Sequence, residues 1–309
     1  MSATVIILEE ISTDAKPTTT STGPVIVRHV VPDQLRGLVA GIIGFDETAP
    51  VQGRVRVQPA GSLLVLEVSF ATPLRIRLLD SPAESESVHD AFLAGMMPVP
   101  VRTVFFGRHA SVQVYLTPIG AFRLLGVPGT QTVRRVLSLL DLMPRLGRDL
   151  PDRLAEARNW DRRFAVVEHE LLLLAAHGRE SNIAAQWVWA QLQHTGGQAR
   201  MMDLARHSGW SARHIGKVFH EVTGMSPKAA AQVVRFERIH ADLGRWDLAE
   251  LAQRHGLADQ SHLSREVRRY AGESPLALAR EQRPTAFTAL LGCDESTRNS
   301  RGAVSELNR

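Results

Sequence analysis

The sequence predicts an α+β protein with a β-rich N-terminal domain and an all-helical C-terminal domain. Between residues 25 and 117, short runs of β-branched and aromatic residues alternate in polarity and are separated by Pro or Gly. This pattern is typical of a β-sandwich or barrel. Residues 182–283 show only helical periodicity. Within them Leu-Ala-x-x-x-Gly occurs twice, 47 residues apart, which indicates an internal repeat.

Composition limits the class of protein. The chain has 309 residues and a mass of 34.0 kDa, enough for two ordinary domains. With 44% hydrophobic and 22% charged residues it is neither collagenous nor a coiled-coil rod, and it is not disordered throughout. The single cysteine, Cys293, excludes an internal disulfide and a Cys-based zinc site. A net charge of +4 and a pI of about 9.8 favour a polyanionic partner.

The same features predict a cytoplasmic protein without a membrane partner. The longest purely apolar run, residues 171–176, is far shorter than a bilayer span. The apolar patch at residues 5–8 has no basic residue before it and two glutamates after it, the wrong polarity for a signal peptide. One thiol suits a reducing compartment.

Five segments follow from the patterning along the chain. We expect a disordered leader at residues 1–24 and a β-rich domain at 25–148. A helical linker at 149–181, a helical domain at 182–283 and a disordered tail at 284–309 are expected to follow. Phe70, Phe105, Phe106 and Tyr115 are expected in the core of the β-rich domain. An amphipathic helical segment at 151–177 is expected to pack on its own domain or against a second copy in a dimer.

Each copy of the repeat reads as a helix, a tight turn and a second helix. Gly209 and Gly256 stand where a short helix ends and a positive φ is needed. Ser211 and Asp259 are good N-caps for second helices at residues 211–223 and 259–271. Each copy closes with Gly-x-Ser-Pro, at 224–227 and 272–275.

The second helices have one apolar face each. The inward residues are Ile215, Val218 and Phe219 in the first copy, and Leu263, Val267 and Tyr270 in the second. Helix, Gly turn and helix form the helix-turn-helix, whose second helix enters the major groove of DNA. A plain helical hairpin is the alternative, but the duplicated marks and the basic outward residues favour DNA binding.

On these residues, DLARHSGWSARHIGKVFHEVTGMSPKAAAQVVRFERI and DLAELAQRHGLADQSHLSREVRRYAGESPLALARE, the chain resembles the AraC/XylS family of bacterial transcription regulators. The resemblance implies two helix-turn-helix units joined by a central helix, here Pro227 to about Leu243. The chain departs from the family at Val267, where Phe is usual, and at Gly216, where larger polar residues are frequent. Gly216 suggests that the first unit reads fewer bases.

The resemblance also implies which residues face the groove. They are Arg213, Gly216 and Lys217 in the first unit, and Gln260, Ser261, Ser264 and Arg265 in the second. These are outward positions near the N-terminal turns of the second helices, the part that approaches base edges. Arg265 can donate two hydrogen bonds to guanine, whereas Lys217 and Arg268 are expected to hold phosphates. The alternative for each basic residue is a solvated helix face.

The N-terminal domain resembles the cupin-like sensor domains of the same family, most clearly at residues 112–127. A metal-binding cupin enzyme needs a His-x-His pair, yet His29, His89 and His109 are isolated, so we expect no metal, cofactor or catalysis. Such a domain is expected to bind a small-molecule effector or to form a homodimer. The resemblance further implies activation through contact with RNA polymerase.

We therefore predict a sequence-specific regulator that binds double-stranded promoter DNA, and not an enzyme. Residues 209–218 lack the spacing of a phosphate-binding loop, and residues 169–177 lack that of a zinc protease. The alternative is a ligand-sensing protein that acts mainly through protein–protein contact and has weak DNA affinity.

Overall fold

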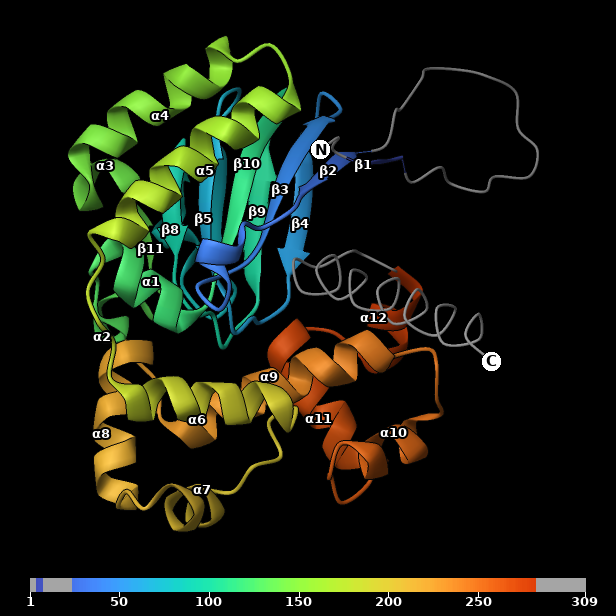
Figure 1. Cartoon of the computed structure of the whole chain (residues 1–309). Helices are drawn as coiled ribbons and strands as arrows, with labels where there is room; N and C mark the ends of the chain where they lie inside the picture. Colours follow the sequence, from blue (N-terminus) through green and yellow to red (C-terminus); the bar gives the residue numbers. More distant parts are fainter. Residues whose placement is uncertain (1–3, 8–23, 282–309) are drawn as a thin grey trace, which may run out of the picture.

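The computed structural model describes residues 4–7 and 24–281, and confirms the predicted α+β fold class. The sheets form one end of the molecule and the helices after residue 182 form the other (Figure 1). The expected tail, and the expected leader apart from residues 4–7 and 24, lie outside the described residues.

Within residues 4–7 and 24–281, all strand pairs are antiparallel and they form two sheets. The seven-stranded sheet has the order β1 (Thr4–Ile7), β2 (Val25–His29), β3 (Val39–Thr48), β10 (Arg108–Leu116), β5 (Leu64–Ser69), β8 (Ala91–Ala94) and β11 (Val136–Ser138). The four-stranded sheet has the order β4 (Arg54–Gln58), β9 (Val101–Phe105), β6 (Leu74–Leu78) and β7 (Ser87–His89). Strand β1 lies inside the expected leader, where a β-branched run favours an edge strand.

Short helices connect the strands, and longer ones cover the outer face of the seven-stranded sheet (Figure 1). The short helices are η1 (Asp33–Leu35), η2 (Ala83–Ser85), α1 (Pro118–Leu125), α2 (Gly129–Thr132) and α3 (Leu139–Leu142). The longer ones are α4 (Pro144–Glu156) and α5 (Trp160–Ala176), which replace the single segment expected at 151–177. The break lies at Asn159, whose side chain accepts a hydrogen bond from the Arg162 N–H and starts α5.

The apolar face of α5 packs on the sheet of its own chain. Phe164, Val167 and Leu171 are at most 3% exposed and belong to the same core as the strands. Of the two arrangements expected for this segment, the structure therefore shows packing within the chain. That face is already buried and is not available for a dimer contact.

The expected aromatic core is correct except at one position. Phe105 and Tyr115 are buried, and Phe70 is half-buried against the core. Phe106 is 46% exposed, because it lies in the turn between β9 and β10 rather than in a strand. Its ring lies 5.6 Å from the Arg75 guanidinium.

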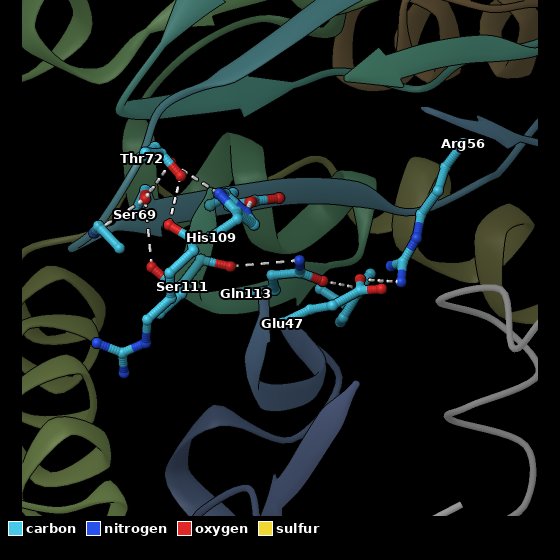
Figure 2. A network of polar contacts seen from close by, with 12 residues as sticks. Glu47, Arg56, Ser69, Thr72, His109, Ser111 and Gln113 are labelled. Atoms are coloured by element: carbon cyan, nitrogen blue, oxygen red, sulfur yellow. Dashed lines mark hydrogen bonds and ion pairs between the residues drawn. The ribbon is translucent and has the colours of Figure 1, made fainter. Parts of the chain in front are cut away.

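A polar network joins strands of the two sheets (Figure 2). Glu47 in β3 pairs with Arg56 in β4, so the network links the two sheets. His109 is 2% exposed and lies between the Glu67 carboxylate, at 2.9 Å, and the Thr72 carbonyl, at 2.8 Å. Burial opposes its charge, but Glu67 and Thr72 raise the pKa of His109 above its usual value. The histidine therefore has partners within the domain.

The C-terminal domain consists of seven helices among the described residues. They are α6 (Ile183–His194), α7 (Met201–Ser208), α8 (Ala212–Thr223), α9 (Pro227–Asp242), α10 (Leu248–Arg254), α11 (Gln260–Ala271) and α12 (Pro275–Glu281). The long central helix expected from Pro227 to about Leu243 is α9. The apolar core of the C-terminal domain is continuous with that of the β domain, so the two domains pack closely.

Candidate nucleic-acid interface

The first helix-turn-helix unit is built from α7 and α8. Gly209 has a φ of 75°, and its N–H donates to the Ala205 carbonyl at 3.2 Å, which closes α7. Two residues later, the Ser211 hydroxyl accepts from the His214 N–H at 3.2 Å and starts α8. The turn therefore has the glycine and the N-cap at the positions that the sequence predicted.

The second unit repeats this arrangement in α10 and α11. Gly256, two residues after α10 ends at Arg254, has a φ of 68°. The Asp259 carboxylate accepts from the His262 N–H at 2.7 Å and starts α11. Asp247 caps α10 in the same way, accepting from the N–H groups of Ala249 and Glu250. In both units, the N-cap side chains and the turn glycines thus set where the helices begin and end.

Buried apolar side chains fix the rotation of α8 and α11. Ile215 and Phe219 in α8, and Leu263 and Val267 in α11, are fully buried. Val267 fills the position where the family usually has Phe without exposing the core. With these faces inward, the opposite faces of both helices point to solvent.

The predicted DNA-contacting residues lie on those solvent faces. Arg213, Lys217, Gln260, Ser261, Arg265 and Arg268 are exposed, and Gly216 and Ser264 are partly exposed. A Cβ built at Gly216 would meet no atom within 4 Å, so this position is open. The Arg265 guanidinium donates to the Ser261 carbonyl of its own helix at 3.3 Å. The contact of each residue with DNA stays a prediction.

Both second helices point their N-terminal turns away from the β domain. The C-terminal end of α8 lies against Gly129, and the Tyr270 carbonyl near the end of α11 accepts from the Ala60 N–H at 2.7 Å. Figure 1 shows α7 and α10 at the end of the molecule remote from the sheets. The expected base-reading turns therefore lie on the accessible side of the helical domain.

Sequence reasoning missed the ion pair that orients α11. Arg235 in α9 donates to Glu266 in α11, with N–O distances of 2.5 Å and 3.3 Å. Glu266 is 8% exposed. The corresponding residue in the first unit, 48 positions earlier, is Val218. The signal was a charged residue at an inward position of an amphipathic helix.

Across residues 4–7 and 24–281, no helix has the length and apolarity needed to span a bilayer. In the same residues, no three His, Cys, Asp or Glu side chains form a group that could hold a metal ion.

Residues 204–281 match the family model described as "Helix-turn-helix domain". No curated protein is a significant match to the chain. Among solved structures, ToxT from Vibrio cholerae O395 shares 9% identity over 77% of this chain and 96% of its own, with a TM-score of 0.43. The C-terminal domain of AraT from Geobacillus stearothermophilus shares 17% identity over 36% and 94%, with a TM-score of 0.32. The AraC-like activator CuxR shares 12% over 64% and 74%, with a TM-score of 0.30.

Because these TM-scores lie below 0.5, the class of protein follows from the family match and from the duplicated helix-turn-helix units alone. Together these define the class of protein: a helix-turn-helix, DNA-binding transcription regulator. Within the chain, residues 204–281 are the helix-turn-helix domain that the resemblance predicted.

Proposed function

We propose that the protein binds promoter DNA with both helix-turn-helix units of one chain and regulates transcription from that site. The observation that carries the proposal is the pair of second helices, α8 and α11. Each is fixed by a buried apolar face and presents a polar, basic face to solvent on the side remote from the β domain.

In the proposed complex, the N-terminal turns of α8 and α11 enter two successive major-groove segments on one face of the duplex. Such segments are about 34 Å apart, and mild bending of the DNA helps both helices to engage. Arg265 reads guanine through two donors, with Gln260, Ser261 and Ser264 beside it. Arg213 reads in the first unit, and Gly216 leaves room there for close approach. Lys217 and Arg268 neutralise phosphates and add affinity without sequence preference.

Selection of genomic fragments by the purified full-length chain tests this proposal. Affinity for the selected fragments and for random duplexes is then measured over a series of salt concentrations. We expect a preference of about 10³ or more for a few fragments at physiological salt. Equal affinity for selected and random DNA would contradict the proposal and favour the alternative, a sensor that works through protein–protein contact.

Activation and its control form the finer part of the proposal, supported by the sequence resemblance. We propose that the bound protein contacts RNA polymerase and activates transcription. We also propose that the β domain responds to a small ligand or to dimerisation. Transcription in vitro from a selected fragment, with and without cell extract, measures whether the bound protein activates or represses. Sedimentation of the free and DNA-bound chain measures dimer formation. Repression by the bound protein would overturn the activator assignment.

A further inference from the structure

The first contact between the domains lies at the turn that closes the first unit. A Cβ built on Gly129, the first residue of α2, would lie 2.2 Å from the Thr223 carbonyl carbon and 2.3 Å from the Gly224 nitrogen. A Cβ built on Gly224 would lie 2.3 Å from the Gly129 carbonyl oxygen. The two backbones therefore touch at a place where only glycine fits on the β-domain side.

The second contact lies at the equivalent turn of the second unit. The Ala60 N–H, between β4 and β5, donates to the Tyr270 carbonyl at 2.7 Å. Gly272, the counterpart of Gly224, lies beside Leu79 and Pro100, at the end of β6 and the start of β9. Both Gly-x-Ser-Pro turns of the internal repeat thus rest on the β domain.

The third contact lies between the other two, on the central helix. Glu237 in α9 is 2% exposed and faces the turn that carries Ser62. One carboxylate oxygen accepts from the Ser62 N–H at 2.7 Å, and the other lies 2.6 Å from the Ser62 hydroxyl. The β domain therefore touches α8, α9 and α11 at once.

We propose that the β domain is a brace that fixes the separation and relative rotation of α8 and α11, and so selects the spacing between the two DNA sub-elements. The inference rests on the proposed function and adds a specificity that none of the base-facing residues supplies. The contacts that the β domain makes with α8, α9 and α11 are all remote from the N-terminal turns that carry the base-facing residues.

Spacing is the property that such a brace controls. One inserted base pair moves a sub-element by about 3.4 Å along the duplex and rotates it by about 35°. Two units held rigidly cannot follow both changes, whereas units joined only through α9 can adjust. Loosening the brace should therefore relax spacing selectivity and leave the base preference within each sub-element unchanged.

Four proteins test the brace. Gly129→Ala places a methyl group into the backbone of residues 222–224, and Glu237→Ala removes both bonds to Ser62. Glu237→Gln retains an acceptor and a donor for Ser62 and is the conservative variant. Gly61→Ala is the matched control, because its new Cβ would meet only the Glu237 carboxylate, at an ordinary 3.7 Å. Far-UV circular dichroism and thermal unfolding identify any variant that fails to fold.

Affinities are measured on duplexes that carry the fragment selected by the wild-type chain, with the spacer between its two protected segments shortened or lengthened by one base pair. Wild type, Gly61→Ala and Glu237→Gln should lose about tenfold or more on either change. Gly129→Ala and Glu237→Ala should lose less than about threefold, while single base substitutions cost them as much as wild type.

Hydrogen exchange of the Ala60 and Ser62 amides reports the docking itself, without DNA. Exchange should be faster in the two loosened variants than in the control. If the wild-type chain prefers a duplex but every folded variant loses the same affinity on a change of spacer length, the brace is overturned and the proposed function is not. A wild-type chain with no preferred duplex would overturn the proposed function, and the brace as a specificity device with it.

Discussion

Arg235 in the central helix α9 and Glu266 in α11 join the two helices through two hydrogen bonds at one carboxylate. Their side chains are 17% and 10% exposed, so the pair is largely shielded from water. In the first unit the corresponding position is Val218, which packs apolarly. The two copies of the repeat thus hold their second helices, α8 and α11, by different means.

Replacing Glu266 should therefore destabilise the helical domain. Glu266→Ala leaves the Arg235 guanidinium without its acceptor in a partly buried place, and should lower the free energy of unfolding by about 1–3 kcal/mol. Glu266→Gln keeps one acceptor and should cost less. Urea denaturation of the three proteins measures the difference, and coincident midpoints would show that the ion pair contributes nothing.

Stability should fall as pH rises because of Glu237. Burial raises the pKa of Glu237 to about 7, although the Ser62 hydrogen bonds and Arg238 act in the opposite direction. The folded chain therefore keeps a proton that the unfolded chain loses near its ordinary pKa of 4.5. This contribution to stability is complete below about pH 4.5, declines between about pH 4.5 and 7, and is constant above.

Chemical denaturation of wild type and Glu237→Gln at pH 5 and pH 8 checks this. The amide does not titrate, so the decrease between the two pH values should be smaller in the variant by about 2–3 kcal/mol. Parallel pH profiles in the two proteins would mean that Glu237 is ionised at both pH values in the folded chain.

Two glycines should respond in opposite ways to the same substitution. No atom lies within 4 Å of a Cβ built at either Gly216 or Gly209, but only Gly209 has a positive φ, of 75°. Gly216→Ala should stabilise α8 by about 0.5–1 kcal/mol, since alanine is the better helix former. Gly209→Ala should destabilise by about 1 kcal/mol through backbone strain. Thermal unfolding measures both, and a loss of stability in both variants would indicate a hidden clash at Gly216.

Arg265 should carry base discrimination. Arg265→Ala should cost about 1–3 kcal/mol in affinity for the selected fragment and relax the preference at one base position. Lys217→Ala should instead weaken all duplexes alike and reduce the salt slope by about 1. Arg162→Ala, an exposed arginine in α5, is the control. If Arg265→Ala binds like this control in a gel-shift series, Arg265 does not contact a base.

The helix-turn-helix units were predictable because their determinants are local. The N-caps Ser211 and Asp259, the turn glycines Gly209 and Gly256, and the inward apolar residues all act within one or two turns of helix. The same holds for the strands, which follow from short β-branched and aromatic runs bounded by Pro or Gly. Capping and period are properties of short windows.

The docking of the domains could not be predicted, because its contacts join distant parts of the chain. Ser62 and Glu237 are 175 residues apart, and neither stands in a motif. Phe106 was misplaced for a related reason, since composition does not show where β9 ends and its turn begins. The inward Glu266 became interpretable only once Arg235 was seen beside it.

Hydroxyl-radical footprinting of the full-length chain on a selected genomic fragment tests the central claim most directly. Two helix-turn-helix units acting together should protect the sugar–phosphate backbone beside two major-groove segments on one face of the duplex, about 10–10.5 base pairs apart. Protection of a single segment, or of segments on opposite faces, would contradict the claim that α8 and α11 bind DNA side by side.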